Sequence, residues 1–138
     1  MEMKRIDDLI TVSPQILPED VAKIAEAGFR SILCNRPDGE SDAHTPFAAI
    51  DAEAKKHGLA IQYQPVVSGQ VLDSDAEDFA EAFATLPAPV FAYCRTGTRC
   101  TILWSLSQSK SRDFPEILSM TQAAGYDMSG LASRIAND

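Results

Sequence analysis

Short runs of β-forming residues alternate with longer amphipathic stretches along the chain, and this alternation limits the fold more than any other feature. Such an order is typical of a parallel sheet covered by helices. The sequence therefore predicts an α/β fold, a central, mainly parallel sheet flanked by helices. The expected strands are 6–12, 30–34, 59–64 and 90–93, and the expected helices are 17–27, 45–57, 73–86, 101–107, 114–124 and 128–136.

Composition and charge disfavour several classes of protein. The 138 residues, of which 45% are apolar, suit one folded domain over residues 1–138. A net charge of −8 disfavours nucleic acid, because proteins that bind it present basic surfaces. No apolar run is long enough for a signal peptide or a membrane span. We expect a cytoplasmic protein without nucleic-acid or membrane partners, and the sequence leaves the oligomeric state open.

The cysteines and histidines show no metal-binding pattern. Cys34, Cys94 and Cys100 form no CxxC pair, and an odd number of cysteines cannot all pair internally. His44 and His57 have no second ligand at the usual spacing. We therefore expect reduced thiols and neither a metal nor another cofactor.

One of these cysteines begins a loop with the chemistry of an anion cradle, Cys94-Arg95-Thr96-Gly97-Thr98-Arg99. The loop lies between strand 90–93 and helix 101–107, at the sheet edge where α/β proteins bind ligands. Backbone N–H groups that enter a helix lack intrahelical acceptors and bind anions.

Each residue of the loop has an expected task. We expect Arg95, Arg99 and the helix dipole to lower the pKa of Cys94 and to bind an anionic substrate. Gly97 allows tight curvature, and the hydroxyls of Thr96 and Thr98 are additional donors. The alternative is that Cys94 has only a structural role as a buried core thiol. Two neighbouring arginines and a glycine disfavour that role.

Several segments resemble the bacterial phosphatase-like domain that also occurs fused to beta-lactamase-fold hydrolases and sulfur dioxygenases. The resemblance covers most of residues 4–107 and implies the fold of dual-specificity protein tyrosine phosphatases, with a catalytic cysteine at the end of the central strand. The segments that carry it are Arg5-Ile6-Asp7-Asp8, Val12-Ser13-Pro14-Gln15-Ile16, 27–40 and 93–99.

The loop length departs from the phosphatase pattern. Protein tyrosine phosphatases place five residues between the cysteine and the arginine, whereas four separate Cys94 from Arg99. Cys-Arg-x-Gly-x-Arg is similar to the active loop of rhodaneses, which carry a persulfide. Since one sulfur atom needs less room than a phosphoryl group, the shorter loop favours sulfur transfer.

The position of the proton donor also departs from the phosphatase pattern. Ester cleavage usually needs a carboxylic acid to protonate the leaving oxygen. In dual-specificity phosphatases an aspartate lies where this chain has residues 65–70, which contain no carboxylate. Asp38, with Glu40 and Asp42 on the same loop, is the possible general acid. Persulfide transfer does not require one.

Each of four further residues has two alternative roles, and the sequence does not decide between them. Arg36 either holds an anionic substrate at the rim or pairs at the surface with Asp38 or Glu40. Ser68 either orients substrate or caps the turn around Gly69. Cys34 and Cys100 are expected to be buried structural thiols, although either is a candidate to form a disulfide with Cys94.

These observations lead to three hypotheses about function. The first is a sulfurtransferase that carries sulfane sulfur on Cys94. The second is a cysteine phosphatase in which Cys94 attacks phosphorus and Arg99 clamps the phosphoryl oxygens. The third is a non-catalytic anion-binding module. All three predict a small anionic ligand, a sulfane-sulfur donor or a phosphate ester for the two enzymes.

Overall fold

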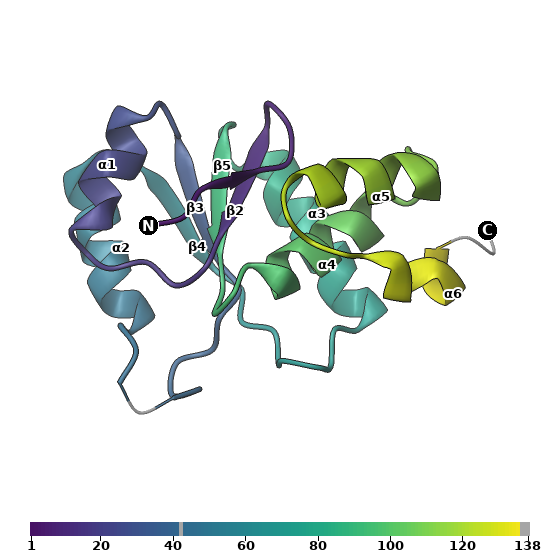
Figure 1. The fold of residues 1–138 in the computed structure, drawn as a ribbon. Coiled ribbons are helices and arrows are strands. Elements are labelled where there is room, and N and C mark those ends of the chain that lie inside the picture. Colours follow the sequence, from purple (N-terminus) through teal and green to yellow (C-terminus); the bar gives the residue numbers. More distant parts are fainter. Residues whose placement is uncertain (42, 136–138) are drawn as a thin grey trace.

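A five-stranded sheet runs through the middle of the computed structural model, which describes residues 1–41 and 43–135 (Figure 1). The strand order is β1-β2-β5-β3-β4. Only the short β1 is antiparallel to its neighbour, so β5 lies in the centre of a parallel sheet. The predicted mainly parallel α/β sheet is confirmed. The strands are β1 (Lys4–Arg5), β2 (Ile10–Ser13), β3 (Ser31–Cys34), β4 (Ala60–Tyr63) and β5 (Val90–Tyr93).

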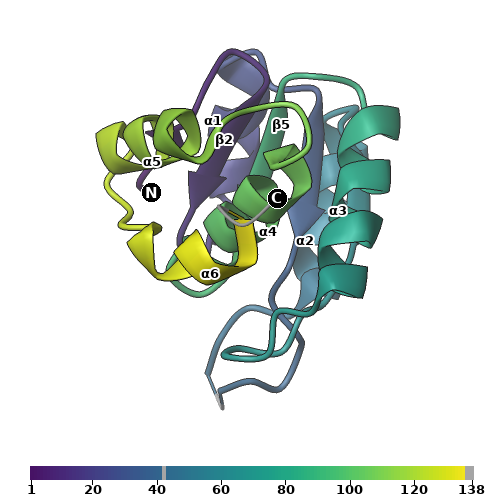
Figure 2. The same cartoon turned by 90° about the vertical axis from the view of Figure 1, so that its right-hand side faces the viewer.

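Helices cover both faces of this sheet and enclose two apolar cores (Figures 1 and 2). On one face Phe91 packs with Ile24 and Ile50 beneath α1 and α2. On the other, Trp104 packs with Phe79 beneath α3 and α4. The two cores fix β5 from both sides. The helices are α1 (Asp20–Glu26), α2 (Phe47–Lys56), α3 (Asp73–Thr85), α4 (Thr98–Gln108), α5 (Phe114–Ala123), the 3₁₀ turn η1 (Ser129–Leu131) and α6 (Ala132–Ile135).

The predicted strand 6–12 is correct only for residues 10–12, which lie in β2, whereas residues 6–9 form no strand. The chain instead forms the two strands β1 and β2, which pair as a hairpin. The Asp7 carboxylate accepts the backbone N–H groups of Leu9 and Ile10 at 2.9 and 3.1 Å. An aspartate that binds the backbone two and three residues ahead is a turn former, and it breaks the run that the apolar pattern suggested.

Two helices also differ from the prediction. Helix α4 begins at Thr98, three residues before the predicted start at Thr101, because Gly97 has φ +89° and turns the chain directly into the helix. The predicted helix 128–136 is a 3₁₀ turn followed by the single turn of α6, and Ala136 lies outside the described residues.

The parallel strands place their following loops at one edge of the sheet. Figures 1 and 2 show the loops after β3 and β4 extending beyond the edge at which β5 enters its own loop. Backbone hydrogen bonds join the first two of these loops, since Val66 donates to the carbonyl of Asn35 at 3.1 Å. No helix in the described part of the chain is long and apolar enough to cross a bilayer.

Candidate active site

The Cys94 loop connects the carboxyl end of β5 to the first turn of α4. Cys94 is fully buried, and so is Gly97, whereas Arg95, Thr96 and Thr98 are exposed. Gly97 is the N-cap of α4. The backbone therefore curves around the Cys94 sulfur at the point where the first helical N–H groups have no intrahelical acceptor.

Several donors converge on the Cys94 sulfur. The backbone N–H of Gly97 donates to Sγ at 3.1 Å. The pKa of Cys94 falls to about 6, chiefly through a hydrogen bond from the Cys100 thiol; burial opposes the shift, and the backbone N–H groups of Cys100, Thr96 and Gly97 add to it. The largest lowering effects are thus hydrogen bonds and not the two loop arginines. Cys94 is a thiolate at neutral pH.

Arg99 is held rigidly beside this thiolate. Its Nη1 donates to Glu40 Oε2 at 2.7 Å and to the Val66 carbonyl at 2.9 Å, and its Nη2 donates to Glu40 Oε1 at 2.8 Å. Burial acts to lower the pKa of Arg99, but the Glu40 bonds and the Cys94 charge outweigh it and raise that pKa. A guanidinium has five N–H groups. Among the described residues, Nε–H and one Nη2 hydrogen of Arg99 have no acceptor.

Glu40 also binds a second arginine. Arg36 Nε donates to Glu40 Oε1 at 3.0 Å, while its two terminal nitrogens donate to Gln15 and Ser41. The bonds from Arg99, and then those from Arg36, lower the pKa of Glu40 against the opposing effect of burial. The predicted pairing of Arg36 with Glu40 is present, but Arg36 is buried and not a surface residue. Its contact with an anion stays a prediction.

The other predicted site residues lie nearer the surface. Thr96 and Thr98 hydrogen-bond each other through their hydroxyls at 3.0 Å. Arg95 is exposed at the rim of the loop. Ser68 is exposed on the turn that Gln70 closes by donating to the Val67 carbonyl, and its hydroxyl has no partner in the described part of the chain. None of these side chains contacts the Cys94 sulfur through a hydrogen bond among the described residues.

Asp38, the predicted general acid, lies at the start of α2. Its Oδ1 accepts the backbone N–H of Phe47 at 2.8 Å, and its own N–H donates to the Tyr63 hydroxyl at 2.8 Å. One carboxylate oxygen therefore stabilises a helix end, and Oδ2 stays available. Asp42, on the same predicted loop, lies outside the described residues.

The two remaining cysteines are buried, as predicted. Burial is the main cause that raises the pKa of Cys34 to about 11 and that of Cys100 well above its ordinary value. Cys34 donates to the Arg36 carbonyl at 3.4 Å. The Cys100 thiol also acts on the active-site sulfur, since it is the largest cause that lowers the pKa of Cys94.

Sequence reasoning missed two partners of the loop. Glu40 was a candidate acid, but nothing in the sequence links it to Arg99, which lies 59 positions later. Tyr126 belongs to no motif, and its hydroxyl donates to the Thr96 carbonyl at 2.9 Å. Both contacts depend on tertiary structure. No group of three or more acidic, histidine or cysteine side chains within 1–41 and 43–135 is arranged as a metal site.

The sequence of this chain matches a known family of protein domains. Residues 2–111 match the model of the phosphatase-like domain of beta-lactamase hydrolase-like proteins. A beta-lactamase hydrolase-like protein of Xylella fastidiosa is 31% identical over 132 residues, which are 93% of this chain and 30% of that protein. One of Agrobacterium fabrum is 29% identical over 79% of this chain and 25% of that protein. The chain spans less than a third of the length of these relatives.

Solved structures show the same fold. A Neisseria meningitidis protein provisionally described as a phosphatase has a TM-score of 0.88 and 34% identity, with 99% of this chain and 98% of that chain covered. A kinase-associated phosphatase shares only 11% identity over 94% of this chain and 88% of its own, with a TM-score of 0.70. The phosphatase fold that the sequence resemblance implied is confirmed.

The first prediction concerns the protonation of Cys94. Titration of the thiolate absorbance in the ultraviolet should give a midpoint near pH 6, because the converging donors lower the pKa of Cys94 to about 6. The raised pKa values of Cys34 and Cys100 keep both thiols out of this range. The Cys94→Ser variant should lack the transition. A midpoint above pH 8 would contradict the stabilisation of the Cys94 thiolate by these donors.

The second prediction concerns the ion pair of Glu40 with Arg99. Glu40→Gln should lower the free energy of unfolding by about 2 kcal/mol at pH 7, since two buried guanidinium groups lose their counter-charge while Glu40 keeps partial access to water. The folded pKa of Glu40 lies below its ordinary 4.5, so its stabilisation is complete above pH 4.5 and is lost as the pH falls through the lower folded value.

Urea unfolding at several pH values measures this effect. The matched control is Asp51→Asn, which breaks the more exposed pair with Lys55 and should change stability by about 0.5 kcal/mol or less. Equal losses in the two variants, or a loss in Glu40→Gln that persists unchanged in acid, would argue against a buried charge network.

Proposed function

The chain belongs to the family of phosphatase-like domains found in beta-lactamase hydrolase-like proteins, and from that premise we propose that it is a cysteine-dependent phosphatase acting on phosphate monoesters. The observation that carries the proposal is the unused N–H edge of Arg99. The guanidinium is fixed by Glu40 and Val66, and the Nε–H and one Nη2 hydrogen stay available beside a thiolate.

The proposed reaction has two displacement steps. The Cys94 thiolate attacks phosphorus, an S–P bond forms, and the P–O bond to the leaving group breaks. Water then attacks the phosphocysteine, releases inorganic phosphate and restores the thiolate. Arg99 would bind two phosphoryl oxygens through its free edge, in the bidentate geometry that guanidinium groups favour. The loop N–H groups, aimed at the sulfur in the absence of substrate, would stabilise negative charge on phosphorus-bound oxygen.

The leaving group needs a proton, and we propose that Asp38 supplies it through Oδ2. Glu40 is unsuited to this role because its two arginines lower its pKa and keep it ionised. Asp38 lies on the same loop after β3 and uses only Oδ1 at the start of α2. One distant structural relative, a Pseudomonas aeruginosa protein with 15% identity and a TM-score of 0.65 over 99% of this chain and 91% of its own, was crystallised with phosphotyrosine. An aryl phosphate is therefore a reasonable test substrate.

Sulfur transfer is the second candidate function. It rests on the four residues between Cys94 and Arg99, a shorter spacing than in tyrosine phosphatases and one similar to that of rhodaneses. The family match favours phosphate chemistry. A persulfide on Cys94 would also use the loop N–H groups, and the edge of Arg99 would then bind the anionic sulfur donor.

The third prediction separates these functions. Wild-type protein should hydrolyse an aryl phosphate. Cys94→Ser should reduce the rate by more than about 10³-fold, because the hydroxyl is a far weaker nucleophile at neutral pH. Arg99→Lys keeps the charge but loses the bidentate edge, so we expect a loss of about 10²-fold. Arg112→Lys is the matched control, at an arginine beyond the far end of α4, and should retain activity.

The same preparations should be tested for thiocyanate formation from thiosulfate and cyanide. Phosphate release that depends on Cys94, with thiocyanate at the level of Cys94→Ser, supports the phosphatase. The reverse pattern would replace it with sulfur transfer. Anion binding without either activity, retained in Cys94→Ser, would indicate a non-catalytic binding module.

The fourth prediction tests Asp38 as the proton donor. Asp38→Asn keeps an Oδ1 acceptor for the Phe47 N–H and removes only the acidic proton. We expect a loss of about 10²-fold with an alkyl or unsubstituted phenyl phosphate, and little loss with a nitrophenyl phosphate, whose leaving group needs no proton. Steady-state rates across a series of leaving groups measure this. A loss confined to Asp42→Asn, assayed in parallel, would assign the proton to Asp42 instead.

A further inference from the structure

One peptide unit of the loop faces the catalytic sulfur on one side and a tyrosine on the other. The Thr96–Gly97 peptide is trans, so its carbonyl and its N–H point in opposite directions. The Gly97 N–H donates to Cys94 Sγ at 3.1 Å, and the Thr96 carbonyl accepts the Tyr126 hydroxyl at 2.9 Å. The two hydrogen bonds therefore lie at opposite edges of a single peptide unit.

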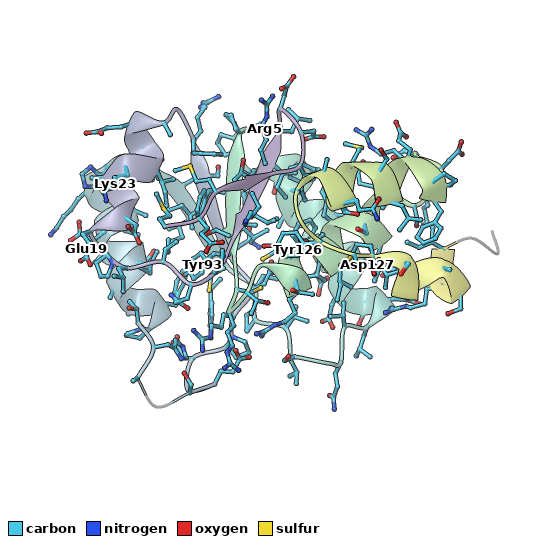
Figure 3. The ribbon with its side chains drawn as sticks, in the orientation of Figure 1. Arg5, Glu19, Lys23, Tyr93, Tyr126 and Asp127 are labelled. Atoms are coloured by element: carbon cyan, nitrogen blue, oxygen red, sulfur yellow. The ribbon has the colours of Figure 1, made fainter. Side chains whose placement is uncertain are left out.

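Tyr126 reaches this peptide from the carboxyl-terminal part of the chain. It follows α5, in the segment that leads to η1, and lies beside the loop that enters α4 (Figure 3). A Cβ atom at Gly97 would collide with the Tyr126 hydroxyl and ring. Tyr126 therefore packs directly on the glycine, and it comes from outside residues 2–111, which carry the family match.

We propose that Tyr126 is a positioning residue of the active site, whose hydroxyl holds the Thr96 carbonyl so that the Gly97 N–H stays directed at the Cys94 sulfur. The inference rests on the proposed role of Cys94 as the nucleophile. It assigns Tyr126 no contact with substrate.

The conformation of Gly97 makes such a restraint necessary. Glycine at φ +89° has access to a wide range of backbone angles, so the peptide before it rotates more easily than one between residues that carry a Cβ. Rotation of this peptide would turn its N–H away from the sulfur and its carbonyl toward a negative charge. A hydrogen bond to the carbonyl opposes that rotation.

The same bond strengthens the donor on the other side. Hydrogen bonds in series polarise one another, so a carbonyl that accepts from Tyr126 makes its own peptide N–H a better donor. Burial, together with the negative charge of Cys94, raises the pKa of Tyr126 to about 12, so its hydroxyl keeps its proton and stays a donor wherever Cys94 is ionised. Tyr126 thus acts on the thiolate through one peptide bond.

Removal of the hydroxyl separates this role from simple packing. Tyr126 also contacts two apolar clusters, with Ile117 in one and Met128 in the other, and Tyr126→Phe keeps the ring that fills this space. We expect the ultraviolet titration midpoint of Cys94 to rise by about half to one pH unit, because the Gly97 N–H is then held less firmly toward the thiolate and is a weaker donor. The acid limb of kcat/KM against pH should move by the same amount.

Tyr63→Phe is the matched control. It removes a phenol hydroxyl that accepts the Asp38 N–H and touches no residue of the Cys94 loop through a hydrogen bond, so the Cys94 midpoint should not change. A thermal unfolding midpoint near that of the wild type shows that Tyr126→Phe is folded. A folded Tyr126→Phe protein with an unchanged Cys94 midpoint would overturn the inference.

The readout does not depend on turnover. A shifted Cys94 midpoint in a protein that releases no phosphate would sustain the role of Tyr126 and remove the proposed function. Phosphate release by Tyr126→Phe with the wild-type pH profile would do the opposite. Should Tyr126→Phe unfold, Tyr126→Leu keeps an apolar side chain of smaller volume without any donor and provides the same titration.

Discussion

A buried thiolate, stabilised by hydrogen bonds to its sulfur, lies at the end of a series of alternating charges in this fold. Cys94 is negative, Arg99 beside it is positive, Glu40 binds Arg99, and Arg36 donates to Glu40 Oε1, which also accepts from Arg99. In the low dielectric of the interior an unmatched charge is costly, and each member of this series is matched by its neighbour. Ionisation of Cys94 completes the series. The network therefore fixes the Arg99 guanidinium beside the Cys94 thiolate.

The parallel sheet is what brings this series together. Gln15 follows β2, Arg36 and Glu40 follow β3, Val66 follows β4, and Arg99 follows β5. Because parallel strands end at the same edge, four loops distant in sequence meet around the Glu40 carboxylate and its two arginines. The two apolar cores on either side of β5 hold that edge in place. Tyr126 adds a fifth support from the carboxyl-terminal segment.

Local patterns predicted the parts of the site that lie close in sequence. The strand before Cys94, the anion cradle and the buried state of Cys34 and Cys100 follow from apolar runs, a glycine and helix entry. The apolar pattern failed to predict a turn that a single side chain forms, as Asp7 does before β2. Glu40 as the partner of Arg99, and Tyr126 as a support of the loop, depend on pairs 59 and 30 positions apart. Periodicity carries no information about such pairs.

The position of Arg99 is unfavourable for the stability of the helix that carries it. Arg99 lies in the first turn of α4, where the helix dipole is positive and a basic side chain is unfavourable. The chain also buries it there, next to a glycine with positive φ. Glu40 and the Val66 carbonyl offset both costs, yet they occupy only part of the guanidinium. Arg99 is thus a basic residue at an unfavourable helix position, where Glu40 and Val66 stabilise it and part of its guanidinium stays available beside a thiolate. Such an arrangement is expected where a transferred anionic group must be bound.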